Sequence, residues 1–178
     1  RRDHPFVPIN CGAFSDELLL SELFGHTKGA YTGAVSNRVG LIEQAENGTL
    51  FLDEIDSLSS KAQVALLRYL QDREIRPQGG NTLKKTNIRV VAASNKSLQD
   101  LVERNEFRDD LLFRLDVLHI DLPPLRERDG DIHLLSQFFM RKAAKEYNLQ
   151  AKVFSPNMIR AMSAYKWPGN IRQLQNIV

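Results

Sequence analysis

Short apolar runs that end in polar residues alternate with helical patterns over the first two thirds of the chain. The continuous runs predict buried parallel strands at 49–53 (TLFLD) and 88–94 (IRVVAAS), with shorter strands at 6–10, 74–76 and 117–122. Apolar residues at helical spacing predict helices at 15–24, 41–47, 59–72, 97–104 and 108–115. Strands that alternate with helices predict an α/β fold in which helices flank a parallel sheet.

Only helices are predicted after residue 124. Their patterns cover 132–147, 156–165 and 170 onward, with Pro156 following a capping serine and Asn170 as the cap of the last helix. We therefore predict an α/β subdomain over 1–124 and a small α-helical subdomain over 125–178. The chain begins just before a predicted strand and stops inside a predicted helix, so we expect it to be part of a longer polypeptide.

Composition excludes several classes of protein. The 178 residues carry a net charge of +2, which gives no argument from bulk charge for nucleic-acid binding. A single cysteine, Cys11, excludes an internal disulfide framework and a cysteine-rich zinc site, and it fits a reducing, cytoplasmic setting. No apolar run is long enough to span a membrane, so no membrane partner is expected.

Asp53 and Glu54 follow the apolar run at 49–53 and carry the first chemical signal. A buried strand that ends in two carboxylates places them at the edge of the sheet where α/β proteins bind ligands. Asp53 would hold Mg²⁺, directly or through water, and Glu54 would polarise an attacking water. The alternative is that both are solvated acids after a core strand.

Three further polar positions have a functional and a structural interpretation. Asn95 follows the second apolar run and would aim an amide at a phosphate or water, or it is a turn residue. Arg108 and Arg114 are six residues apart, so at ~100° of rotation per residue they lie on different helix faces. Either would reach a phosphate in a neighbouring subunit, or pair with Asp109, Asp110 or Glu106 on the surface.

The segment GHTKGAYTGA (25–34) is glycine-rich with an aromatic residue at its centre, which is typical of a contact loop rather than a helix. It is not a phosphate-binding loop, because GxxxxGK[ST] occurs nowhere in the chain. Near the C-terminus, WPGNIRQLQN places Arg172 in the first turn of a helix. That arginine would approach bound phosphates, or stack on Trp167.

Taken together, these segments resemble the central AAA+ ATPase domain of the bacterial enhancer-binding proteins, the NtrC-like activators of sigma-54 RNA polymerase. GAYTGA resembles the GAFTGA signature of that family, TLFLDEID its Walker B segment and FRDDLLFRL its arginine-finger segment. LPPLRERDGDI resembles the start of its lid, and WPGNIRQLQN its sensor II segment. The motifs occur in the order of the family and cover nearly the whole chain.

The resemblance implies a role for each matching residue. Asp53 and Glu54 would handle Mg²⁺ and activate water, Asn95 would be sensor I, and Asn10 would restrain Glu54 in a switch. Arg108 and Arg114 would act in trans, which implies a ring, expected to be a hexamer, and Arg172 would be sensor II. The sigma-54 contact would be Gly29, Ala30, Tyr31, Thr32, Gly33 and Ala34.

The implied function is ATP hydrolysis that moves this loop and remodels the closed complex of the sigma-54 RNA polymerase holoenzyme. The implied cofactors are ATP and Mg²⁺, and enhancer DNA would be bound by a domain outside this chain. The Walker A loop and its strand are expected upstream of Arg1, so we expect these 178 residues alone to be inactive. Tyr31 replaces a phenylalanine of the family, which leaves an alternative open: an AAA+-like assembly module that controls another polymerase form without hydrolysis.

Overall fold

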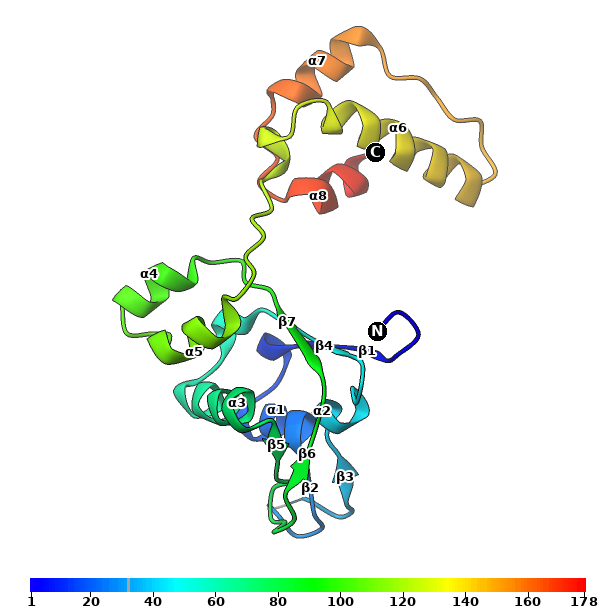
Figure 1. Ribbon diagram of the computed structural model, residues 1–178. Helices are drawn as coiled ribbons and strands as arrows, with labels where there is room; N and C mark the ends of the chain where they lie inside the picture. The colour runs from blue at the N-terminus through cyan, green and yellow to red at the C-terminus, as the bar shows by residue number, and fades with distance from the viewer. Residues whose placement is uncertain (32) are drawn as a thin grey trace. The chain divides into compact units, whose positions relative to one another are not determined.

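Three parallel strands form the centre of the first part of the chain. In the computed structural model, which describes residues 1–31 and 33–178, the sheet order is β1 (Phe6–Asn10), β4 (Thr49–Asp53) and β7 (Arg89–Ala92) (Figure 1). The central position of β4 leaves Leu50 and Leu52 with no exposed surface. The continuous apolar run of TLFLD follows from this burial, since a strand covered on both faces has no solvated side.

The register of the strands brings their carboxyl ends to one edge of the sheet. Asn10 is paired with Asp53 across β1 and β4, and Leu52 is paired with Ala92 across β4 and β7. Residues that directly follow these strands therefore lie beside one another, as the sequence predicted.

Five helices accompany the sheet in the described part of the first unit, which spans 1–119. They are α1 (Asp16–Phe24), α2 (Leu41–Gln44), α3 (Ser60–Asp72), α4 (Leu98–Glu103) and α5 (Asp109–Leu115). Ser59 and Ser97 accept hydrogen bonds from backbone amides of the first turns of α3 and α4. Ser15 makes no such side-chain bond, although α1 begins directly after it.

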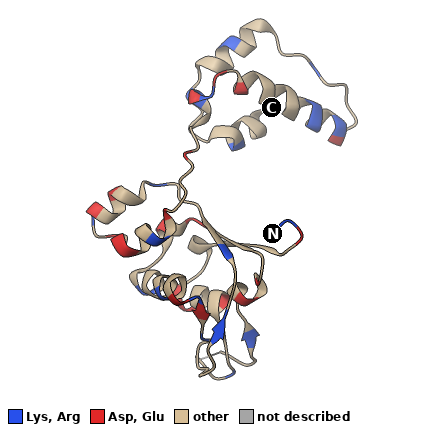
Figure 2. Ribbon diagram, viewed as in Figure 1, with Lys and Arg blue, Asp and Glu red and all other residues tan. Residues whose placement is uncertain are grey.

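Two short hairpins lie together at one end of the first unit (Figure 1). β2 (Gly25–His26) pairs with β3 (Arg38–Val39), and β5 (Glu74–Ile75) pairs with β6 (Lys84–Lys85). Figure 2 shows basic residues on β3 and β6. The sequence predicted a strand at 74–76 but not β2, β3 or β6, because two residues are too few to show an alternating pattern.

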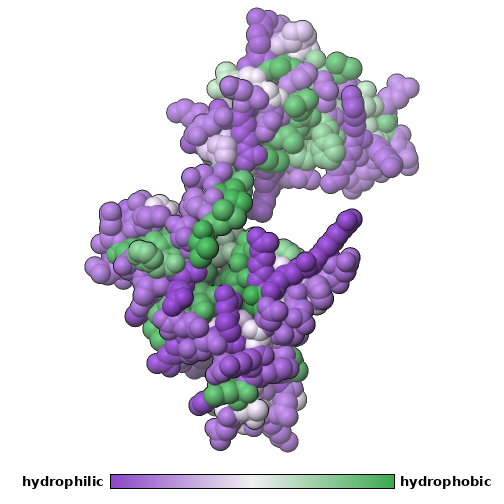
Figure 3. Space-filling model, in the orientation of Figure 1, coloured by the Kyte–Doolittle hydropathy of each residue, from purple (hydrophilic) through white to green (hydrophobic). Residues whose placement is uncertain are grey.

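The prediction of a strand at 117–122 was wrong. The segment after α5 has no strand assignment, and its apolar side chains are exposed, for example Val117 at 85% and Leu122 at 79%. Figure 3 shows apolar surface in this part of the molecule. A strand requires a neighbour for its backbone hydrogen bonds, and among the described residues the sheet ends at β7, so apolar sequence alone does not make a strand here.

The second unit, 120–178, is helical in the regions where the sequence predicted helices. It contains a 3₁₀ turn (Leu125–Glu127) and the helices α6 (Asp131–Glu146), α7 (Pro156–Ala164) and α8 (Asn170–Ile177). Its own core consists of buried side chains from these segments and from the turn before α8: Leu125, Ile132, Phe139, Met162, Trp167 and Leu174.

Asn170 has a different role from the predicted helix cap. Gly169 occupies the capping position of α8, and Asn170 is its first residue, with a left-handed φ of 50°. The Asn170 side-chain oxygen instead accepts a 2.8 Å hydrogen bond from the backbone amide of Leu125. Asn170 therefore joins the start of the unit to its last helix.

Among the described residues of the whole chain, no helix has the length and apolar character that would let it cross a membrane.

Candidate active site

Four of the predicted site residues lie at the carboxyl edge of the sheet. Asn10 ends β1, Asp53 ends β4 and is followed by Glu54, and Asn95 lies three residues beyond the end of β7. Hydrogen bonds from Ala93 N to Leu52 O (2.8 Å) and from Ile55 N to Ala93 O (3.0 Å) hold the ends of β4 and β7 together. The structure thus brings together the carboxylates and the two amides that the sequence analysis singled out.

Glu54 has a constrained backbone and a close neighbour. Its φ of 53° and ψ of 47° are left-handed, a conformation that a non-glycine residue adopts at a cost and that is concentrated at functional sites. A Cβ placed on Gly12 would lie 2.7 Å from Glu54 Oε2 and 3.4 Å from Asn10 Oδ1. The lack of a side chain on Gly12 therefore leaves room for the Glu54 carboxylate, while Asn10 Oδ1 accepts from Gly12 N at 2.8 Å.

The carboxyl edge is electronegative. Burial, followed by the charges of Asp53, Asp56 and Glu54, raises the pKa of Cys11 to about 12. Asp53 is exposed, and one of its oxygens accepts a 3.0 Å hydrogen bond from Glu54 N. An exposed carboxylate in a negative field suits a hard divalent cation, because Mg²⁺ prefers one or two carboxylates together with water and phosphate oxygens.

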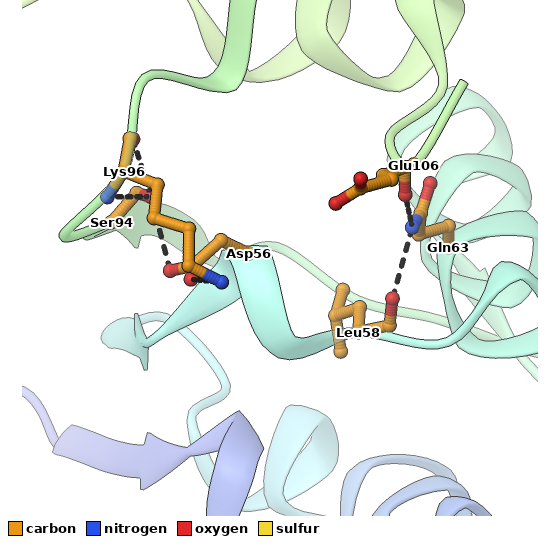
Figure 4. A network of polar contacts seen from close by, with 6 residues as sticks. All are labelled: Asp56, Leu58, Gln63, Ser94, Lys96 and Glu106. Carbon is orange, nitrogen blue, oxygen red and sulfur yellow. Dashed lines mark hydrogen bonds and ion pairs between the residues drawn. The ribbon is translucent and has the colours of Figure 1, made fainter. Parts of the chain in front are cut away.

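An ion pair between the exposed Lys96 side chain and the buried Asp56 carboxylate fixes the turn that carries Asn95 (Figure 4). The Asp56 side chain is only 2% exposed and lies 3.3 Å from Lys96 Nζ. Ser94 Oγ donates to the other Asp56 oxygen at 3.0 Å. Asn95 is therefore held between two residues anchored to the turn after β4. The sequence analysis did not single out Asp56 or Lys96; their positions directly beside the predicted site residues were the available signal.

The two candidate arginines lie at opposite ends of α5. Arg108 precedes the helix and donates from Nε and Nη2 to the two oxygens of Asp110, at 2.9 and 2.7 Å. The hydrogen bond from Arg108 lowers the pKa of the Asp110 carboxyl below its usual value. Arg114 lies exposed in the last turn. Within the described part of the chain, neither arginine has a hydrogen bond or ion pair with Asp53, Glu54 or Asn95.

Gln63 on α3 is a buried polar residue that the sequence analysis missed. It is 1% exposed, and its amide contacts the backbone of three residues, Leu58, Glu106 and Arg108. The signal was a glutamine on the apolar face of a helix, beside Ala62, Leu66 and Leu67. Such a residue needs buried partners, which the sequence alone does not identify.

The glycine-rich loop folds back on the first hairpin. Gly29 N donates to Ala34 O at 2.9 Å, and Ala34 N donates to Tyr31 O at 3.0 Å. The Tyr31 ring packs edge-on against His26 with centroids 5.2 Å apart, and buried His26 is hydrogen-bonded through Nδ1 to Ser21 Oγ at 2.6 Å. Gly33 takes a φ of 105° that favours glycine. Thr32, the remaining predicted contact residue, lies outside the described residues.

The base of this loop rests on the second hairpin. Thr27 N donates to Gln78 O, and Gln78 N donates to Gly25 O, both at 2.9 Å. A Cβ on Gly79, whose φ is 73°, would lie 2.7 Å from Thr27 Oγ1 and 2.9 Å from Ala30 Cβ. The loop and the β5–β6 connection are therefore in close contact.

Arg172, the predicted sensor II residue, is exposed in the first turn of α8 in the second unit. Trp167 is buried there, where its indole nitrogen donates to Met162 O at 2.7 Å and its ring packs edge-on against Tyr165. The tryptophan thus has a place in the core of this unit.

The chain is similar to known transcriptional regulators along its whole length. Residues 1–121 match the family described as the sigma-54 interaction domain, and residues 126–178 match the AAA+ ATPase lid domain. Over 178 residues it is 47% identical to the transcriptional regulatory protein GlrR of Escherichia coli (strain K12), covering 100% of this chain and 40% of the relative. Over 176 residues it is 48% identical to the Nif-specific regulatory protein of Azotobacter vinelandii, covering 99% of this chain and 34% of the relative.

Solved structures show the same fold. NtrX from Brucella abortus in complex with ATP matches with a TM-score of 0.90 at 32% identity, covering 99% of this chain and 40% of that one. The NtrX structure with ADP matches with the same TM-score. The chain spans less than half the length of each of these proteins.

Proposed function

Since the chain belongs to the family of sigma-54 interaction domains and ends in an AAA+ lid, we propose that it is the motor of a cytoplasmic transcriptional activator. In the complete protein it hydrolyses ATP within a ring, which we take to be a hexamer. The ring uses the GAYTGA loop to remodel the closed complex of sigma-54 RNA polymerase. A domain outside these 178 residues binds enhancer DNA. The complete protein is a signal-responsive regulator.

The observation that carries this proposal is the meeting of Asn10, Asp53, Glu54 and Asn95 at one edge of the sheet. A structural role for two adjacent acids would not require a left-handed Glu54 backbone, nor a glycine that clears the space beside its carboxylate. Glu54 accepts a proton from the attacking water, and Asn10 restrains Glu54 until the site is assembled.

ATP and Mg²⁺ fit this edge. The relative NtrX was solved with ATP, and Asp53 offers an exposed carboxylate in an electronegative setting. When bound, Mg²⁺ would supply positive charge to the phosphate oxygens. Asp53 would hold the metal directly or through water, the Asn95 amide would orient toward the terminal phosphate, and Arg172 is proposed as a further positive charge for the phosphates.

Arg108 and Arg114 act on the site of a neighbouring subunit. A planar guanidinium offers several donors to the charge that develops on a phosphoryl group. In the single chain the Arg108 side chain is 45% exposed and held by Asp110, itself 48% exposed. An exposed ion pair of this kind contributes little free energy, so a phosphate readily displaces Asp110 from Arg108.

The test is transcription in vitro by the full-length protein, with polymerase carrying either sigma-54 or another sigma factor. We expect open complexes only with the sigma-54 form and only with hydrolysable ATP. The Glu54→Gln variant keeps ATP binding but loses most hydrolysis and all open-complex formation. Activity with another polymerase form, or with a non-hydrolysable analogue, would instead support an assembly module that works without hydrolysis.

A further inference from the structure

Gln63 joins the turn after β4 to the segment before α5, and Figure 4 shows its bonds to Leu58 and Glu106. Its Nε2 donates to Leu58 O at 2.9 Å and to Glu106 O at 3.0 Å, and its Oε1 accepts from Arg108 N at 2.9 Å. Leu58 ends the turn that follows Asp53 and Glu54, and Arg108 begins α5. One buried amide thus spans from the carboxylate turn to the backbone of the trans-acting arginine.

We propose that Gln63 is a positioning residue for Arg108. The inference rests on the proposed function, because it requires Arg108 to act in a neighbouring site. Gln63 places the Cα of Arg108 by binding its amide and the carbonyl two residues before it. Gln63 binds the backbone at Arg108 and not its guanidinium, which extends from this fixed backbone.

The other bonds in the region explain why the arginine depends on Gln63 more than the carboxylates do. The turn after β4 is held without Gln63, since Ile55 N donates to Ala93 O at 3.0 Å and Ser57 N donates to Glu54 O at 2.9 Å. Among the described residues, Arg108 N donates its hydrogen bond to Gln63 Oε1. Loss of the amide should therefore displace Arg108 while leaving Glu54 in place.

Gln63→Met in the full-length protein removes all three bonds in a side chain of similar length without adding charge. We expect kcat for ATP hydrolysis to fall about 10- to 100-fold, because small displacements of a catalytic group have costs of this size. KM for ATP should change less than about twofold, because the arginine of the neighbouring subunit stabilises charge that develops in the transition state more than it binds ATP in the ground state. Gln99→Met, on the exposed side of α4, serves as the matched control.

Mixed rings separate a positioning role from a general loss of structure. The reference mixture of Arg108→Ala with Glu54→Gln should regain activity, because intact Glu54 sites are then served by intact arginines. Gln63→Met mixed with Glu54→Gln should regain activity for the same reason. Gln63→Met mixed with Arg108→Ala should show no activity above that of the two variants alone, because neither subunit supplies a placed arginine.

The mixtures test two claims, that Arg108 acts in trans and that Gln63 positions Arg108. No recovery in the reference mixture overturns the trans role of Arg108 and the role of Gln63 with it. Recovery there, but none when Gln63→Met is mixed with Glu54→Gln, overturns the role of Gln63 alone. Recovery with Arg108→Ala would overturn it as well, as would unchanged kcat in Gln63→Met.

A second variant and a measurement by hydrogen exchange keep the test independent of activity. Gln63→Glu retains an oxygen that accepts from Arg108 N but loses the two donated bonds. Hydrogen exchange at the Arg108 amide should be slow in the wild type, intermediate in Gln63→Glu and at least about tenfold faster in Gln63→Met. Equal protection of this amide in the wild type and in Gln63→Met would overturn the inference.

Discussion

At the scale of single residues, the carboxyl edge of the sheet is crowded around Glu54. Gly12 has a backbone conformation open to other residues, but its Cβ would lie 2.7 Å from Glu54 Oε2. The clash involves the end of a flexible side chain, so the carboxylate moves and the fold does not. We expect Gly12→Ala to lower kcat for ATP hydrolysis about tenfold or more. The thermal midpoint should stay within about 3 °C of the wild type. A variant that unfolds much earlier, or hydrolyses ATP normally, would contradict this account of Gly12.

Cys11 reports the negative charge of the same edge. Burial and the charges of Asp53, Asp56 and Glu54 raise its pKa to about 12 from 9.0. Because the thiolate is the reactive form, alkylation by iodoacetamide at pH 8 should be about three orders of magnitude slower in the folded protein than in denaturant. Asp53→Asn removes one of the charges, lowers the pKa of Cys11 and should speed the folded-state reaction.

The raised pKa also sets the sign of a pH effect on stability. The thiol stays neutral in the folded protein, so its contribution is complete below the unfolded pKa near 9 and is lost as pH rises toward 12. Stability of the wild type should therefore fall more steeply over this range than that of Cys11→Ser, as measured by urea unfolding at several pH values. Parallel curves would mean that burial of Cys11 does not perturb its titration.

At the scale of elements, the contact between the two hairpins links the GAYTGA loop to the rest of the first unit. Gly79 needs its positive φ, and a Cβ there would press on Thr27 and Ala30. We expect Gly79→Ala to displace the loop, so that binding to sigma-54 polymerase and open-complex formation fall about tenfold or more while ATP hydrolysis changes less than about twofold. Loss of hydrolysis without loss of polymerase binding would contradict a role for this contact in loop placement.

The elements also show what the sequence could predict. β1, β4, β7 and the helices of five or more residues follow from apolar periodicity, and Asp53, Glu54 and Asn95 follow from the ends of those strands. Of the hairpin strands only β5 was predicted, since β2, β3 and β6 are too short for a pattern, and the segment at 117–122 has the composition of a strand without a described neighbour to pair with. Gln63 and Asp56 act through partners distant in sequence, so pattern alone does not identify their contacts.

At the scale of the whole molecule, the chain has two separate cores. The first contains Leu50, Leu52, Leu66 and Tyr69, and the second contains the single tryptophan, Trp167, which is 3% exposed. Tryptophan fluorescence therefore reports on the second unit, while amide exchange in β4 reports on the first. The two probes allow each unit to be followed in the same sample.

Separate cores imply that a cavity in one unit need not destabilise the other. Leu174 on α8 has no exposed surface, and truncating such a leucine costs about 2–5 kcal/mol. We expect Leu174→Ala to lower the urea midpoint seen by Trp167 fluorescence while exchange protection in β4 is retained. Leu66→Ala on α3 is the reciprocal control and should lower protection in β4 with little effect on the fluorescence midpoint. If either variant shifts both probes equally, the units unfold as one cooperative body, and motions of the lid and of the sheet in the proposed motor must be treated as a single transition.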